Sequence, residues 1–435
     1  MGTKLADLAE LAGFSFKTKK FWQVKIMDAD SPWLASTGIP GKEDMPPMPQ
    51  KLAPNPWKEA SSLIIAAKVN AKAKSQLDSE RSNDAFQKVL PIDDCDYRLL
   101  MAKRSGRSSF LANAFVFPGG YVELADFSTK WWAVFEAAGI SRSELTRFGG
   151  DIRGPRPPIC SEPGVLMQEE YLSADILPGN VALRITAIRE TFEETGILLL
   201  NRAPSRKNNK TASFASETDF AKIDLKTWQK KIHENPVSFA DFCLEVGLCP
   251  DIWSLSEWWN WLTPDAIGHK RFDTMFYVCC LDSIPASLCD DNEVAKLEWL
   301  SPLEMLEEHI QKRAVLAPPQ VYELSRISNL NSMAQLREFA EKREKEGIER
   351  WCAKITGLKD GALLALPGDE LYDKPPEVNS KYLPSLEEMR MRCKSLNRIE
   401  LRAPTMIAVS NVKLDYGHLT PIAYPPVHSS IQSNL

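Results

Sequence analysis

The sequence predicts an α/β layered domain. Short apolar segments typical of sheet-core strands recur between residues 61 and 300, and an amphipathic helix lies among them at 181–194. Further helical segments follow residue 302. Strands mixed with one-faced helices are typical of a sheet that is covered by helices.

The composition excludes several classes of protein. Of 435 residues, 26% are charged and 44% are hydrophobic, as in ordinary globular chains. The net charge of −5 argues against a strongly basic nucleic-acid scaffold. No apolar run reaches the ~18 residues of a membrane span, so we expect none. Nine cysteines without a CxxC pair predict reduced thiols in an intracellular protein.

Five strands are expected, because each segment is short and rich in apolar residues. They occupy 61–68, 97–103, 114–117, 271–281 and 297–300. The third strand ends at Pro118-Gly119-Gly120, which is a strong turn signal.

The helix at 181–194 has the clearest pattern. Its apolar residues at 181, 185, 188 and 192 share one face, and Gly196 is placed to cap its C-terminus. The other helices are expected at 131–138, within 217–262, and at 303–310, 319–327 and 333–348. From about residue 355 the chain is expected to be irregular.

Four tryptophans cluster near the end of the segment 217–262: Trp253, Trp258, Trp259 and Trp261. Packing between helices explains them most simply, and an adenine or acyl pocket is the alternative.

Three glutamates of the central helix are candidate metal ligands. Glu190, Glu193 and Glu194 stand at i, i+3 and i+4, so they are neighbours on one face. Carboxylate oxygens suit a hard divalent ion, Mg²⁺ or Mn²⁺. Taken alone, the three residues are also compatible with a solvated acidic face.

The surrounding residues resemble the Nudix box of the Nudix hydrolases. Gly120 and Asp126 match its first half, and the run from Arg189 to Ile197 (RETFEETGI) matches its second half. Asp126 replaces the usual Glu, and Thr191 replaces an apolar residue. The linker between the halves, residues 127–188, is 62 residues long, where the family has a short one.

A box split in this way is similar to the peroxisomal coenzyme A diphosphatase branch of the family. Four further segments, 103–110, 271–274, 316–324 and 366–369, look like the same branch. The resemblance implies a Nudix α/β/α sandwich with a mixed sheet and a large insertion inside the box. It divides the chain into three parts: an N-terminal extension at 1–57, a Nudix hydrolase domain at 58–302 with insertions at about 127–180 and 202–262, and a helical, then irregular, extension at 303–435.

The same resemblance implies a metal-dependent hydrolase that cleaves the pyrophosphate of coenzyme A and acyl-CoA esters. The products would be 3′,5′-ADP and (acyl-)4′-phosphopantetheine. Glu190, Glu193 and Glu194 would bind Mg²⁺ or Mn²⁺, and one of the last two, or the loop residue Glu293, would activate water. Arg189 would fix the ligand geometry.

Other residues are expected around the substrate. Gly119 and Gly120 would let the backbone pass close to the phosphates, and Arg104 and Arg107 are candidates to clamp the 3′-phosphate. Asp126 is a candidate outer metal ligand.

Two alternatives to this function stay open. The substrate could be ADP-ribose, NADH or capped RNA, although the net charge and the single basic run at 202–210 argue against nucleic acid as a partner. The chain could also be a non-catalytic Nudix-fold binding module, although such a module would be expected to lose a helix glutamate.

The last three residues are Ser433-Asn434-Leu435. They are close to the Ser-Lys-Leu address that a peroxisomal import receptor reads. We therefore expect a peroxisomal location, with mitochondrial and cytoplasmic locations as alternatives. The sequence does not choose the preferred acyl chain, the oligomeric state or the role of residues 303–435.

Overall fold

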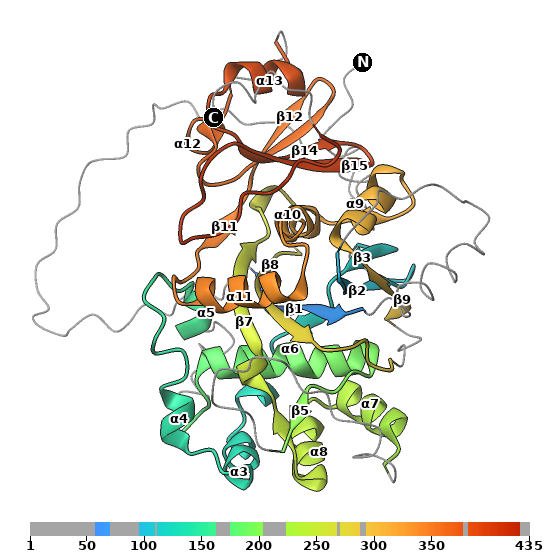
Figure 1. Ribbon diagram of the computed structural model, residues 1–435, viewed down its shortest axis with the longest axis vertical. Coiled ribbons are helices and arrows are strands. Elements are labelled where there is room, and N and C mark those ends of the chain that lie inside the picture. The colour runs from blue at the N-terminus through green and yellow to red at the C-terminus, as the bar shows by residue number, and fades with distance from the viewer. Residues whose placement is uncertain are drawn as a thin grey trace, which may run out of the picture.

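The computed structural model describes residues 57–69, 95–108, 111–161, 175–202, 223–267, 270–287, 293–376 and 382–426 (Figure 1). The terminal tripeptide, the basic run beyond residue 202 and nearly all of the N-terminal extension lie outside these residues.

A nine-stranded mixed sheet forms the centre of the molecule, which confirms the predicted fold class. Its main path runs β10-β3-β2-β1-β8-β7-β11, while β4 pairs with β1 and β9 pairs with β2. The strands are β1 (Lys58–Lys68), β2 (Tyr97–Arg104), β3 (Ala114–Val116), β4 (Gly119–Tyr121), β7 (Leu255–Leu262), β8 (Phe272–Leu281), β9 (Val294–Leu300), β10 (Val315–Leu316) and β11 (Arg350–Cys352). The long strands β1 and β8 pair in parallel and are buried on both faces, as expected of a sheet that helices cover.

The central helix is α6 (Gly179–Thr195), as its apolar periodicity predicts. Val181, Ile185, Ile188 and Phe192 are all fully buried. Gly196 adopts a left-handed φ of 70°, and its N–H donates to the carbonyl of Phe192 at 2.8 Å. The predicted glycine cap is therefore confirmed, since this conformation is the one that glycine adopts at little cost.

Helices cover the sheet on both sides (Figure 1). On the α6 side the remaining elements are η1 (Leu124–Phe127), α3 (Lys130–Ala137), α4 (Arg142–Thr146), α5 (Pro158–Ser161), α7 (Leu225–Glu234), α8 (Ser238–Val246) and the short pair β5 (Leu200–Asn201) and β6 (Cys249–Pro250). On the other side α11 (Met333–Glu344) packs against β1, β7 and β8. Helices therefore pack on both faces of the main sheet and bury its side chains in the main hydrophobic core.

The prediction of a helical segment through residue 262 is wrong at its end. The tryptophan-rich run forms β7, which pairs with β8 inside the main sheet, so the proposed insertion cannot extend to 262. All eight residues of β7 are buried, and the strand therefore lacks the alternation of polar and apolar residues that identifies a half-exposed strand.

The C-terminal part continues with helices and then departs from the prediction. The helices α9 (Pro302–Ile310) and α10 (Pro318–Ile327) form as expected. The expected irregular chain is instead a four-stranded antiparallel sheet, in the order β12-β13-β14-β15. Its elements are β12 (Lys354–Leu358), β13 (Gly361–Ala365), β14 (Asn397–Arg402) and β15 (Thr405–Ser410), with α12 (Glu370–Asp373) and α13 (Leu386–Arg392) between them.

Two absences can be stated for the described residues. None of their helices has the length and apolar character needed to cross a bilayer. Eight of the nine cysteines lie in the described ranges, and all eight are free thiols.

His309 ties the C-terminal sheet to the helices before it. Its Nδ1–H donates to the carbonyl of Ala314 at 3.0 Å, and its Nε2 accepts the backbone N–H of Met406 on β15 at 2.9 Å. Only the neutral ring makes both bonds, because a protonated Nε2 cannot accept. Burial lowers the pKa of His309 below its ordinary value of 6.5.

We expect His309 to make stability depend on pH. Because the pKa of His309 is lower in the folded state than in the unfolded chain, the neutral ring stabilises the fold fully above pH 6.5. This stabilisation is lost as the pH falls below 6.5. Urea unfolding at pH 7.5 and 5.5 should therefore show a larger loss of unfolding free energy in the natural protein than in His309→Gln. Carboxylate titrations cancel in this comparison, and equal losses would contradict the role of His309.

Candidate active site

The α6 glutamates lie at the wall of a cavity of about 670 Å³. Glu193 and Glu194 are buried, with 6% and 4% of their surfaces exposed, and Glu190 is half-buried. The alternative of a solvated acidic face is thus excluded for Glu193 and Glu194, because a solvated face would leave its carboxylates in water.

Arg189 is the centre of the hydrogen bonding around these glutamates. Its Nη1 donates to Glu190 Oε1 at 2.9 Å and to Glu193 Oε1 at 2.7 Å. Its Nε and Nη2 donate to the two oxygens of Asp126 at 2.8 and 3.0 Å, and Nη2 also donates to the carbonyl of Tyr121 at 3.0 Å. All five N–H groups of the guanidinium therefore have an acceptor, which offsets the cost of burying its charge.

Asp126 reaches this centre across the long insertion. The short helix η1 places the fully buried carboxylate of Asp126 beside α6. There Oδ2 also accepts hydrogen bonds from the hydroxyl of Thr186 at 2.7 Å and from the N–H of Glu123 at 3.0 Å. Both oxygens are occupied by donors from the protein. The geometry therefore makes Asp126 a residue that positions Arg189, and leaves it poorly placed for the expected outer ligand role.

Gly119 of β4 is required by close packing against the backbone, and Gly120 lies against the carboxylate of Glu190. A Cβ on Gly119, whose φ is 151°, would lie 2.2 Å from the carbonyl oxygen of Ser61. A Cβ on Gly120 would lie 2.3 Å from Glu190 Oε2. The N–H of Gly119 donates to Glu194 Oε2 at 3.1 Å. In this structure the glycines therefore let β4 approach β1 and the glutamates, and both also line the cavity.

The acidic cluster has raised pKa values. Burial raises the pKa of Glu190 to about 8, against the opposing charge of Arg189. Burial also raises the pKa of Glu193, and burial together with the neighbouring Glu190 raises that of Glu194. Desolvated carboxylates that repel one another are the environment that a cation stabilises.

The donor set fits a hard divalent ion. In the described ranges no three Asp, Glu, His or Cys side chains already converge as a metal centre. Glu190 Oε2 and Glu194 Oε1 nevertheless accept no hydrogen bond from any described residue, and both side chains line the cavity. All-carboxylate oxygen donors suit Mg²⁺ or Mn²⁺.

Three further charged or polar residues gather at this end of the cavity. Arg104 and Glu293 lie close enough to Glu194 to change its pKa, and both also change the pKa of Tyr121. Arg104 donates to Ser108 Oγ from Nε at 3.1 Å and from Nη2 at 2.9 Å. Arg107 is exposed at the cavity lining. The structure thus brings every site residue that the sequence predicted into one region.

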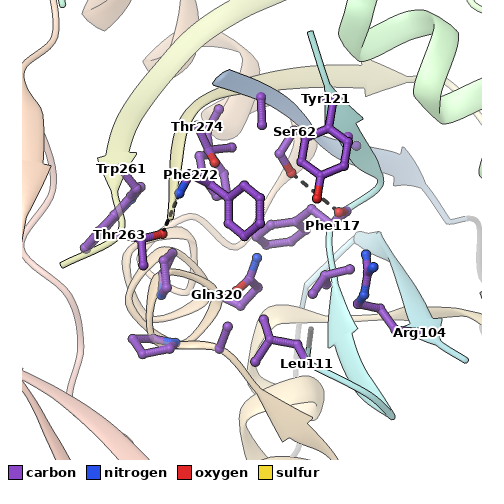
Figure 2. A pocket seen from close by; sticks show the side chains of 18 of the residues that line it. Ser62, Arg104, Leu111, Phe117, Tyr121, Trp261, Thr263, Phe272, Thr274 and Gln320 are labelled. Carbon is purple, nitrogen blue, oxygen red and sulfur yellow. Dashed lines mark hydrogen bonds between the residues drawn. The ribbon is translucent and has the colours of Figure 1, made fainter. Parts of the chain in front are cut away.

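Sequence reasoning missed several residues of the cavity. His233 on α7 approaches Glu193, with 3.4 Å between Nδ1 and Oε2, and no local motif marks it. Figure 2 shows Tyr121 around the same space, together with Phe272 and Gln320, which lie in the matched segments 271–274 and 316–324 but were given no role. Part of the C-terminal sheet also lines it, which could not be found before that sheet was recognised.

The tryptophans divide between the two explanations. Trp261 lines the cavity, as Figure 2 shows, and its Nε1 donates to Glu323 at 2.8 Å. Trp258 and Trp259 are buried in the core, and Trp253 packs partly buried against it. Trp258 and Trp259 lie on the strand β7, where the sequence predicted helix, whereas Trp253 lies in the short helix η5 (Ile252–Ser254) and packs against Phe135 of α3.

Known proteins with similar sequences share most of their length with this chain. The chain is 36% identical over 392 residues to "Acyl-coenzyme A diphosphatase NUDT19" of Gallus gallus, an alignment that covers 87% of this chain and 98% of that protein. It is 35% identical to the Homo sapiens protein of the same name, over 75% of this chain and 83% of that one. A Nudix hydrolase structure from Alicyclobacillus acidocaldarius is 18% identical, with a TM-score of 0.40, over 65% of this chain and 96% of that one.

Two family models also match. The model of the NUDT19 Nudix domain matches residues 57–327, and that of the NUDT19 C-terminal domain matches residues 356–411. The first match alone spans more than half of the chain, and it contains both halves of the split box. The chain belongs to the NUDT19 family of Nudix hydrolases.

Proposed function

We propose that this protein hydrolyses the pyrophosphate bond of coenzyme A and acyl-CoA esters. The observation that carries the proposal is the cavity, which holds a carboxylate cluster at one end and apolar side chains at the other. An acyl-CoA has the same division, with phosphates at one end and a hydrocarbon chain at the other. The names of the relatives in chicken and human agree with this substrate class.

We propose Glu190, Glu193 and Glu194 as the ligands of Mg²⁺ or Mn²⁺. The bound ion would supply charge neutralisation for the oxygens of the pyrophosphate. Arg189 holds Glu190 and Glu193 in place, and the N–H of Gly119 holds Glu194. These contacts keep the ligands from turning away from the substrate, as the partners of metal ligands do in other proteins.

In the proposed reaction, water adds across the P–O–P bond. The water oxygen forms a bond to phosphorus, the bridging oxygen leaves with its phosphate, and a carboxylate takes the proton of the water. Glu193, Glu194 and Glu293 are the candidates for that carboxylate. Arg104 and Arg107 line the cavity, and we expect their positive charges to bind substrate phosphates, including the 3′-phosphate.

The first experiment is product analysis with the purified protein. CoA, acetyl-CoA, lauroyl-CoA, ADP-ribose, NADH and capped RNA are offered in parallel, with Mg²⁺, with Mn²⁺ and with EDTA. We expect 3′,5′-ADP from the CoA compounds above all other products, and no turnover in EDTA. If another compound is cleaved in preference, the assignment of CoA and acyl-CoA as substrates is wrong. If no compound is cleaved, the protein is better explained as a non-catalytic binding module.

We further propose that the protein is imported into peroxisomes through Ser433-Asn434-Leu435. The supporting observation is the similarity of these residues to a receptor-read terminal signal. A fluorescent protein carrying the last residues of this sequence should enter peroxisomes, and the fusion without these three residues should stay in the cytosol. Equal distribution of the two fusions would contradict the proposal.

A further inference from the structure

The cavity continues from the glutamates to an apolar far wall that the Nudix motif does not explain. One face of the C-terminal sheet provides this wall. The side chains that line it are Ile355, Ala362, Leu364, Ile399, Leu401 and Met406.

The strand register shows that these side chains form a continuous surface. Ile355, Leu364 and Ile399 are direct cross-strand partners, and they form one row across β12, β13 and β14. Ala362 pairs with Leu401, which pairs with Met406, and these form a second row across β13, β14 and β15. Alternate residues of a strand point to the same face, so the two rows together form one apolar patch.

The opposite face of this sheet is packed against α13. Leu358, Leu363 and Ala365 form a separate buried cluster there with Leu386 and Met389. The sheet therefore stands between α13 on one side and the cavity on the other. A wall that is supported from behind in this way can hold a fixed shape against a ligand.

Two polar atoms on residues that line the cavity are buried without a partner among the described residues. Gln320 is 6% exposed and Ser61 is 1% exposed, and both residues line the cavity. Gln320 Oε1 and Ser61 Oγ are buried without a hydrogen-bond partner among the described residues. Figure 2 shows Gln320 reaching into the space between Phe117, Phe272 and Leu111. Buried polar atoms normally have partners, so these two indicate a ligand with polar groups beside them.

We propose that the cavity-facing side of the C-terminal sheet holds the acyl chain of the substrate and sets its preferred length, while Gln320 binds an amide of the pantetheine arm. This inference rests on the proposed function. From the phosphate end, the arm offers amide groups first and the thioester-linked hydrocarbon last. The cavity lining offers a group for each part: the glutamates of α6, Gln320 on α10, which packs against β15, and the apolar face of the sheet.

The first test changes the apolar wall. Ala362→Leu adds volume to the cavity face, and Ala365→Leu adds the same volume to the opposite face of the same strand. We measure kcat/KM for lauroyl-CoA relative to free CoA. In the natural protein each added methylene should raise kcat/KM by up to about fourfold. Ala362→Leu should lower the lauroyl-to-CoA ratio at least tenfold, and Ala365→Leu should leave it unchanged.

A second variant keeps the test valid if Ala362→Leu does not fold. Met406→Ala enlarges the cavity at the far row, so the longest accepted chain should lengthen relative to the natural protein. Unchanged chain-length profiles in both Ala362→Leu and Met406→Ala would overturn the acyl wall. Absence of any CoA cleavage by the natural protein would overturn the proposed function instead, so the two failures are distinguishable.

Gln320→Met tests the amide contact, because it keeps the length of the side chain and removes its hydrogen-bonding groups. A neutral hydrogen bond in such a site corresponds to about a two- to tenfold rise in KM for CoA and for lauroyl-CoA. Inhibition by 3′,5′-ADP, which lacks the pantetheine arm, should keep its inhibition constant. Equal weakening of all three ligands would indicate a general structural role and would overturn the assignment of Gln320.

Discussion

Replacing Glu194 with glutamine should abolish most turnover and leave the protein folded. The substitution removes a negative charge from the cluster but keeps the shape of the side chain. Loss of one group that stabilises charge in the transition state typically lowers kcat by about 10²–10³-fold. The folded state should be as stable as before or more stable, because burial and the nearby Glu190 both disfavour the charged form of Glu194.

Glu193→Gln should lower turnover similarly, with some loss of stability. Glu193 also accepts a hydrogen bond from Arg189 and lies beside His233, whereas Glu194 accepts only from the N–H of Gly119 among the described residues. Steady-state rates in Mg²⁺ and thermal unfolding in EDTA measure the two effects separately. Glu245→Gln, on the exposed surface of α8, is the matched control and should behave as the natural protein. Near-full activity of Glu194→Gln would exclude Glu194 as a ligand or a base.

Replacing Arg189 with methionine should destabilise the protein strongly as well as inactivate it. Arg189 is 1% exposed and is shared by Asp126, Glu190 and Glu193. Its removal leaves Asp126 buried without a cation, and breaking a buried ion pair from one side typically costs about 3–5 kcal/mol. Urea unfolding at neutral pH measures this loss.

Two controls separate the buried pair from a general effect of losing arginine. Arg142→Met removes an exposed arginine that pairs with Glu136 and Asp175, and exposed pairs contribute about 0–1 kcal/mol. The double variant Arg189→Met with Asp126→Leu removes both buried charges and should recover part of the stability. If Arg189→Met costs no more than Arg142→Met, the central role of Arg189 is wrong.

The helix that carries the site could be predicted from local sequence because its signals are local. The apolar residues of α6 repeat with the helical period, and Gly196 ends the helix in the conformation that glycine favours. The spacing of Glu190, Glu193 and Glu194 follows from the same helix. The two halves of the split box could be matched by their residue types alone, although the role of Asp126 beside Arg189 could not.

Local patterns failed where burial is complete or pairing is distant. The strand β7 is buried throughout, so its sequence shows no two-residue alternation. The C-terminal sheet joins β13 to β14 across more than thirty intervening residues, and short strands separated in this way leave a weak local signal. His233 lies in no motif, and Gln320 lies in the matched segment 316–324 without an assigned role, because the role of each depends on what lies opposite it in the fold.

The sequence by itself thus determined the class of fold, the central helix with its glycine cap, and the spacing of the three glutamates that line the cavity. These features depend on interactions within one or two turns of chain, which residue order specifies directly. The tertiary structure decided that Asp126 satisfies Arg189 across 62 residues and that the C-terminal sheet completes the cavity. Those contacts join segments that are far apart in the chain, and only packing around a common core brings them together.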